Sequence, residues 1–237
     1  MFNQIFEELN TSIISHGGSK VQLESKFKEY FSRKKDAVIR SFVWDVPGFR
    51  RWRITRMDVG EKLQVLNSVA YPNYSNDQPI FGIDFLWFGT KKKLVAVLDF
   101  QPLIQNDDYF ERYFSGLKTL KKHYSDFNTK KEMNLYDSKK YFSPWVLFYV
   151  GDANNLKYSL KEVFLNFLDK YWLIQKLPDR DYKSLSTKQV KDFQFEYDVY
   201  NAEVDPAHGL FKSYFGKQWA DDFVHQFLFP KSLRECQ

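Results

Sequence analysis

Five short apolar runs follow one another between residues 37 and 102, and their close spacing is the feature that most constrains the fold. Each run is rich in Val, Ile, Phe or Trp, and residues typical of turns, such as Pro47-Gly48 and Gly60, separate it from the next. Connections this short favour antiparallel pairing, because a parallel crossover needs about a dozen residues or more. The runs are AVIRSFVWDV (37–46), FRRWRITRM (49–57), KLQVLNSVAY (62–71), FGIDFLWFG (81–89) and KLVAVLDFQP (93–102). The sequence therefore predicts an antiparallel meander, and WVLFYV (145–150) predicts a sixth strand.

Apolar residues at helical spacing lie on both sides of this meander in the sequence. The N-terminal stretch 2–31 has this spacing, with a break at Gly17-Gly18, and four more helices are expected after residue 105. Ser159 with Glu162 three residues later is typical of a capping box. The four later helices are expected at 107–124, 159–177, 187–209 and 215–229. Aromatic residues make up 19% of the chain, and hiding them requires cover on both sheet faces. We therefore expect a three-layer α/β/α sandwich with a central antiparallel β-sheet, built as one domain over residues 1–237.

Several classes of function find no support in the sequence. It contains no G-x-G-x-x-G after a strand, no P-loop and no G-x-S-x-G elbow, which argues against common nucleotide sites and hydrolase sites. The histidines are far apart in the sequence and form no metal-binding pair. The single cysteine, Cys236, argues against a disulfide framework and is typical of a reducing compartment, so we expect a cytoplasmic protein, with a plastid stroma as the alternative. No apolar stretch is long enough for a membrane span, and no secretory signal is visible.

The chain carries a mild positive charge, net +5 at neutral pH. This excess favours an acidic partner, or it reflects only a lysine-rich surface. The run Lys91-Lys92-Lys93 is interpreted as a solvated turn, because no recognition helix accompanies it. Nucleic-acid binding is therefore not expected.

The most informative residues are polar groups inside apolar strands. Asp84 lies in the middle of FGIDFLWFG, although Asp is rare in strands and a buried unpaired carboxylate is costly. Burial raises the pKa of such a carboxyl, which makes it a candidate general acid. The alternative is that Asp84 faces solvent or bonds to a loop backbone.

Three further polar residues are candidates on the same grounds. Asn67 and Asp99 interrupt the neighbouring apolar runs, and Asp99 should lie on the sheet face opposite to Leu98 and Phe100. Asp205 precedes Pro206, where a helix must end. Each of these residues taken singly has a structural alternative: a satisfied polar group for Asn67 and Asp99, and a turn or cap for Asp205.

Several of these segments together resemble the ferredoxin-dependent bilin reductases. The likeness rests on FRRWR (49–53), LNSVAYP (66–72), FGIDFLWFG, YFSPW (141–145) and DPAHGLF (205–211), and it runs from about residue 1 to 230. It implies an α/β/α sandwich in which biliverdin IXα lies between the sheet and the C-terminal helices. It also implies that no flavin, nicotinamide or metal is bound, and that reduced ferredoxin delivers electrons one at a time.

The resemblance also implies roles for single residues. Asp84 matches the central aspartate of the family, which faces the pyrrole nitrogens, and is the expected proton donor. Asn67 and Thr55 stand where members that form phycocyanobilin have a histidine and a glutamate. This difference favours reduction of the 15,16 methine bridge, giving 15,16-dihydrobiliverdin on the way to phycoerythrobilin. Asp205 matches an aspartate on the other side of the bilin, where it donates a proton, holds the substrate or marks an enzyme that performs two reductions.

Alternatives remain at this point. The chain could continue to phycoerythrobilin, act on 15,16-dihydrobiliverdin, or carry a bilin without turnover. A monomer is expected, and a second bilin reductase is a candidate acceptor of the product.

Overall fold

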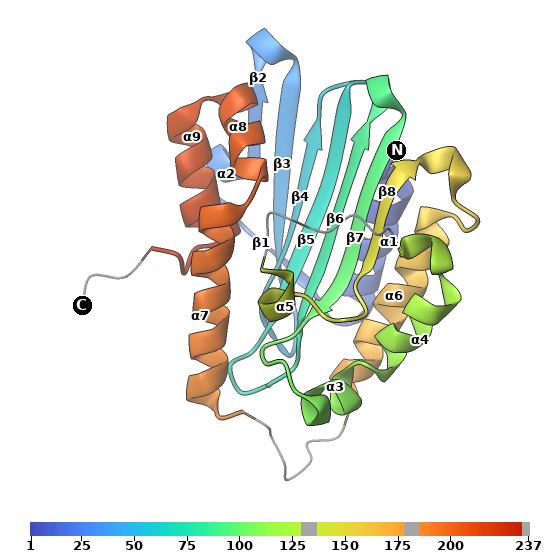
Figure 1. The fold of residues 1–237 in the computed structure, drawn as a ribbon. Helices are drawn as coiled ribbons and strands as arrows, with labels where there is room; N and C mark the ends of the chain where they lie inside the picture. Colours follow the sequence, from blue (N-terminus) through green and yellow to red (C-terminus); the bar gives the residue numbers. More distant parts are fainter. Residues whose placement is uncertain (129–136, 178–184, 234–237) are drawn as a thin grey trace.

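The computed structural model describes residues 1–128, 137–177 and 185–233, so Cys236 lies outside the described residues. Within them, eight strands form one antiparallel sheet (Figure 1). The order is β1-β3-β4-β5-β6-β7-β8, and β2 pairs with β3 next to β1. The strands are β1 (Ser19–Val21), β2 (Glu29–Ser32), β3 (Ala37–Asp45), β4 (Phe49–Asp58), β5 (Leu63–Pro72), β6 (Ile80–Phe88), β7 (Lys93–Gln101) and β8 (Leu147–Asp152). The predicted meander and its sixth strand are confirmed as β3 to β8.

The N-terminal prediction was only partly right. Helix α1 (Asn3–Ser15) forms as expected, but the rest of the stretch contributes β1, the short helix α2 (Ser25–Lys28) and β2. Gly17 has a φ of 84°, which turns the chain back toward the sheet. Pairing with the open edge of β3 supplies backbone hydrogen bonds that helical spacing alone does not reveal.

Three of the later predicted helices are interrupted in the structure. The stretch 107–124 divides at Phe114, the stretch 187–209 divides before Pro206, and 215–229 ends in a π-helix, Phe223–Leu228. Only the stretch 159–177 stays whole. The helices are α3 (Asp107–Tyr113), α4 (Ser115–His123), α5 (Ser138–Tyr141), α6 (Leu160–Gln175), α7 (Thr187–Val204), α8 (Ala207–Phe215) and α9 (Lys217–Asp222).

Helix starts are fixed by short capping contacts. The Ser159 side chain accepts a hydrogen bond from the backbone N–H of Glu162 at 3.1 Å, which is one half of the predicted capping box. A complete box, with both reciprocal bonds, forms instead between Ser186 and Gln189 at the start of α7. The capping residue was therefore predicted correctly, but the second half of the box was not.

Helices cover both faces of the sheet, which confirms the expected α/β/α sandwich. Helices α1, α3, α4 and α6 lie on one side, and α7, α8 and α9 on the other (Figure 1). Toward α6, the sheet presents an aromatic core: Phe81 and Phe100 are fully buried and lie 5.3 and 4.8 Å from the ring of Phe167. Side chains alternate along a strand, so Gly82 and Asp84 face the opposite layer. None of the helices in the described ranges is long and apolar enough to cross a membrane.

Candidate functional site

A cavity of about 450 Å³ lies between the sheet and the helical layer of α7 and α8. This volume is within the range of roughly 300–1,000 Å³ that small-molecule sites occupy. Strands β4 to β7 form the floor, while the end of α7, the start of α8, the last residue of the π-helix and Phe229 form the opposite wall. The lining is mostly apolar, with few polar groups, as in pockets that bind small molecules.

The polar groups of the floor form a row across three strands. In the strand register Thr55 lies opposite Asn67, and Asn67 lies opposite Asp84. Residues directly opposite on neighbouring strands have their Cβ atoms about 5 Å apart and on the same face. The meander therefore brings these three side chains together, although the sequence separates them by 12 and 17 residues.

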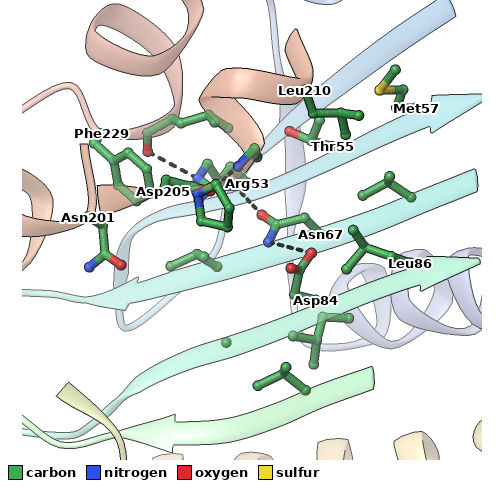
Figure 2. A pocket seen from close by; sticks show the side chains of 18 of the residues that line it. Arg53, Thr55, Met57, Asn67, Asp84, Leu86, Asn201, Asp205, Leu210 and Phe229 are labelled. Carbon is green, nitrogen blue, oxygen red and sulfur yellow. Dashed lines mark hydrogen bonds between the residues drawn. The ribbon is translucent and has the colours of Figure 1, made fainter. Parts of the chain in front are cut away.

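Hydrogen bonds join this row to a buried arginine. Nη1 of Arg53 donates to Oδ1 of Asn67 at 2.6 Å, and Nδ2 of Asn67 donates to Oδ1 of Asp84 at 3.2 Å (Figure 2). Arg53 is only 1% exposed and also donates from Nε to the backbone carbonyl of Leu228 at 3.1 Å. Its guanidinium carbon lies 5.4 Å from the ring centre of Phe229. Arg53 thus connects the sheet to the C-terminal segment across the cavity.

Asp84 has the pKa of a group that can donate a proton near neutral pH. Desolvation is the main cause, and together with the negative charge of Asp205 it raises the pKa of Asp84 from 3.8 to about 7, against the opposing effects of Asn67 and Arg53. The side chain is half-buried and lines the cavity, so it can reach a ligand there. A carboxyl in this state acts as a general acid.

Asp205 ends α7 and lines the opposite wall. It has extended backbone angles, as expected before Pro206, and its Oδ1 accepts a hydrogen bond from the N–H of Ala207 at 2.8 Å. Its pKa is raised by desolvation, despite that backbone bond and the positive charges of Arg53 and His208. The expected capping role and a place in the cavity therefore both apply to this residue.

Asp99 lies on the cavity face, as its position opposite to Leu98 predicted, but its oxygens are already occupied. Oδ2 accepts from the backbone N–H of Ser143 at 2.8 Å, and Oδ1 accepts from the Ser143 hydroxyl at 2.5 Å. Burial raises the pKa of Asp99 well above its ordinary value, although these bonds oppose the rise. Asp99 thereby anchors the YFSPW segment, whose Phe142 lines the cavity. This arrangement favours the structural alternative for Asp99.

The helical wall is held to the sheet by another buried bond. The hydroxyl of Tyr197 on α7 donates to Oε1 of Gln101 at 2.6 Å. Gln101 lies over Gly82, where an added Cβ would come within 2.9 Å of the same Oε1 atom. Gly82 thus leaves the space that lets the two layers connect at this point.

Arg53 is the residue of the site that the sequence analysis missed. It lies two positions before Thr55 in a strand, so alternation places both side chains on the face that carries Asn67. Strand alternation could therefore have indicated Arg53. In the sequence analysis, this residue was considered only as part of the segment FRRWR (49–53). In the described ranges, no group of three or more His, Cys, Asp or Glu side chains is placed to hold a metal ion.

Comparison with known proteins identifies the family. The model of the ferredoxin-dependent bilin reductase family matches residues 6–230, so the chain belongs to this family, and the resemblance noted in the sequence is confirmed. The name of the family states that electrons come from ferredoxin.

Several relatives carry a more particular name, 15,16-dihydrobiliverdin:ferredoxin oxidoreductase. One from Prochlorococcus marinus is 56% identical over 98% of this chain and 96% of its own length. Another, from a Synechococcus strain, is 50% identical over 98% of this chain and 99% of its own length. Among solved structures, phytochromobilin synthase from tomato in complex with biliverdin superimposes with a TM-score of 0.78 at 26% identity, covering 98% of this chain and 84% of that one. The fold is therefore the bilin reductase fold.

Proposed function

We propose that the chain is a 15,16-dihydrobiliverdin:ferredoxin oxidoreductase, which reduces biliverdin IXα at the 15,16 methine bridge to 15,16-dihydrobiliverdin. The observation that carries the proposal is the full-length identity of about half or more with relatives of that name. The cavity supports it, since an apolar space with two carboxyls of raised pKa suits a flat conjugated ligand that must be protonated.

The reaction adds two electrons and two protons to the pigment. Two reduced ferredoxins each give one electron, and the conjugated tetrapyrrole accepts them, so the protein itself needs no redox group. Each added electron makes the pigment more basic. Asp84 then transfers its proton to the pigment and becomes a carboxylate, which solvent reprotonates. The position of the acid determines which double bond is lost, and for this reason Asp84 is assigned the role of proton donor and Asn67 a role in substrate binding.

Asp205 is assigned to the same chemistry from the opposite wall. It donates the second proton or holds the substrate. An enzyme that continues to phycoerythrobilin would use it for a second reduction, and this remains the alternative function. The positive net charge suits an acidic ferredoxin, and association that is driven by charge weakens as ionic strength rises.

The test is anaerobic reduction of biliverdin with photoreduced ferredoxin, followed by chromatography of the product. A lasting blue shift with 15,16-dihydrobiliverdin as the product is the expected result. Phycoerythrobilin would favour the alternative function, and an unchanging bound spectrum would mean a bilin carrier. Adding a second bilin reductase to the reaction tests whether the product passes to it.

A further inference from the structure

The side chain of Arg53 carries a full charge in the interior of the site, and its surroundings are unusual for such a group. In the described part of the chain, no carboxylate forms a salt bridge with it. Its hydrogen bonds go to neutral acceptors, the Asn67 amide and the Leu228 carbonyl. A buried charge without a direct partner is costly, so such a group is expected to serve a purpose beyond packing.

The hydrogen-bond chemistry of arginine fixes the orientation of its neighbour. A guanidinium has donors only, so the Asn67 atom 2.6 Å from Nη1 must be the carbonyl oxygen. The amide nitrogen must then face Asp84, where it donates to Oδ1 at 3.2 Å. Because an unprotonated carboxyl oxygen is the better acceptor, the proton of Asp84 resides on Oδ2.

We propose that Arg53 is a positioning residue for proton delivery: its guanidinium sets the orientation of the Asn67 amide and thereby makes Oδ2 of Asp84 the oxygen that carries and donates the proton. This inference rests on the proposed function and deepens it. The transfer balances, since Oδ2 gives one proton to the reduced pigment, Asp84 becomes a carboxylate that solvent reprotonates, and Arg53 takes no part in the proton exchange.

The charge of Arg53 has a second consequence for the same site. Asp84 on β6 and Asp205 at the end of α7 both lie in its field, which lowers the pKa of each. The single positive charge of Arg53 balances one carboxylate. The site is therefore electrically neutral when Asp84 and Asp205 together hold one proton. The other titratable or charged groups near Arg53 are Tyr71, Tyr197 and Arg51. Burial raises the pKa of both tyrosines further above neutral, whereas the pKa of Asp84 is raised to about 7 and that of Asp205 is raised by desolvation, so the pH profile near neutrality reports on Asp84.

The variants Arg53→Met and Arg53→Lys separate orientation and charge from packing. Met removes the donors and the charge, whereas Lys keeps the charge and can only donate. Arg51→Met is the matched control, because Arg51 is a neighbouring arginine of β4 that packs over Phe227 and does not line the cavity. All three variants are first compared for biliverdin binding and for thermal unfolding.

The decisive measurement is the pH profile of single-turnover reduction, together with the product distribution. Arg53→Met is expected to reduce biliverdin at least about tenfold more slowly at pH 6.5, with a mixed product. The alkaline limb of the profile, where the rate falls as pH rises and Asp84 loses its proton, should move up by about one pH unit. The reason is that a neighbouring cation lowers a carboxyl pKa by about that much or more. Arg53→Lys and Arg51→Met should keep the wild-type limb and product. A folded, biliverdin-binding Arg53→Met with the wild-type limb and product would overturn the inference.

Two further measurements keep the inference testable whatever the first gives. Should Arg53→Met fail to fold, Asn67→Leu removes the amide that joins Arg53 to Asp84 and leaves Arg53 in place. The alkaline limb of this variant must move up, since the Asn67 hydrogen bond lowers the pKa of Asp84. An unmoved limb there also contradicts the inference. Infrared spectroscopy of the protonated Asp84 carboxyl in ligand-free protein, identified by its loss in Asp84→Asn, needs no turnover. The pH at which this carboxyl is half protonated must rise in Arg53→Met, or in Asn67→Leu if Arg53→Met does not fold. This result is required even if ferredoxin reduces no biliverdin. In that case the inference about Arg53 stands and only the proposed function fails.

Discussion

Asp84 on the sheet and Asp205 on the neighbouring helical layer line one cavity from opposite walls, and the negative charge of Asp205 raises the pKa of Asp84. Strand pairing places the first carboxyl on the floor, and a helix end before Pro206 places the second on the wall. Two acids with raised pKa values on both sides of one space can protonate a ligand from either face. The variants below distinguish their contributions.

Asp84→Asn should still bind biliverdin but lose most of its reduction, by about 100-fold or more, because general acids contribute about that factor or more. Asn preserves the shape and can accept the Asn67 hydrogen bond, so the fold should persist. The first electron can still arrive, and we expect a long-lived bilin radical. Stopped-flow absorbance and electron paramagnetic resonance after mixing with reduced ferredoxin check this. Turnover near the wild-type rate would remove Asp84 from the donor role.

Asp205→Asn should shift the pH profile in the direction opposite to Arg53→Met. The amide oxygen can still accept from the Ala207 N–H, so the cap survives, but the negative charge that raises the pKa of Asp84 is gone. Asp84 then loses its proton at lower pH, and the alkaline limb of reduction moves down. Measuring the rate between pH 5.5 and 9 checks the direction. Wild-type rate, limb and product together would make Asp205 a purely structural residue.

Thr55→Val should stabilise the ligand-free protein and weaken ligand binding. The Thr55 hydroxyl is buried in the cavity floor and has no hydrogen-bond partner among the described residues. A buried unpaired hydroxyl lowers the free energy of unfolding by about 1–3 kcal/mol, and Val avoids this cost at equal volume. A hydrogen bond from the hydroxyl to the ligand contributes about 1 kcal/mol to binding, which is a factor of about five in affinity. Thermal unfolding and biliverdin titration measure the two effects. Thr55→Ser keeps the hydroxyl and should retain the affinity; a Val variant with undiminished affinity contradicts a contact to the ligand.

The stability of the ligand-free protein should also depend on Asp84. Its pKa is about 7 in the folded state against 3.8 ordinarily, so between these values the folded protein holds a proton that the unfolded chain has released. The free energy of unfolding therefore falls as pH rises through this window, and the contribution of Asp84 is lost above about pH 7. The loss is at most about 4 kcal/mol, and less because the carboxyl opens onto the cavity. Chemical unfolding of wild type and Asp84→Asn at pH 5 and pH 8 should show the variant gaining relative stability at pH 8; equal pH dependence would contradict the raised pKa.

The sheet could be predicted from the sequence because its determinants are local. Alternating apolar side chains and short turns specify each strand, and a connection of a few residues permits only antiparallel neighbours. The same alternation placed Asp99 on the cavity face correctly. β1 and β2 escaped prediction because they are short and exposed, and their pairing with β3 is a tertiary contact that leaves no pattern in their own residues.

The site was predictable only in part, for a related reason. Asp84 stood out as a carboxyl in an apolar run, and the cavity does bring it together with Asn67 and Asp205. The link through Arg53 depends on strand register and on a carbonyl 175 residues away. Neither follows from the local sequence. Register is set by turns and packing, so the partners of a polar strand residue become visible only when the sheet is assembled.

Asp99 provides the contrast to Asp84, since both are carboxyls of raised pKa on one sheet face. Asp99→Asn replaces one acceptor oxygen by a donor, which either meets the Ser143 N–H, another donor, or faces the Ser143 oxygen and leaves the hydroxyl proton without its acceptor. We expect a loss of about 1–3 kcal/mol in the free energy of unfolding, the cost of an unsatisfied buried group. The product and the alkaline limb should be unchanged, because both Asp99 oxygens are bonded to Ser143 and the side chain is fully buried. Denaturant unfolding, with Ser143→Ala as a milder control, and the pH profile of reduction measure both. A stable Asp99→Asn variant with a moved limb would instead make Asp99 a third acid of the site.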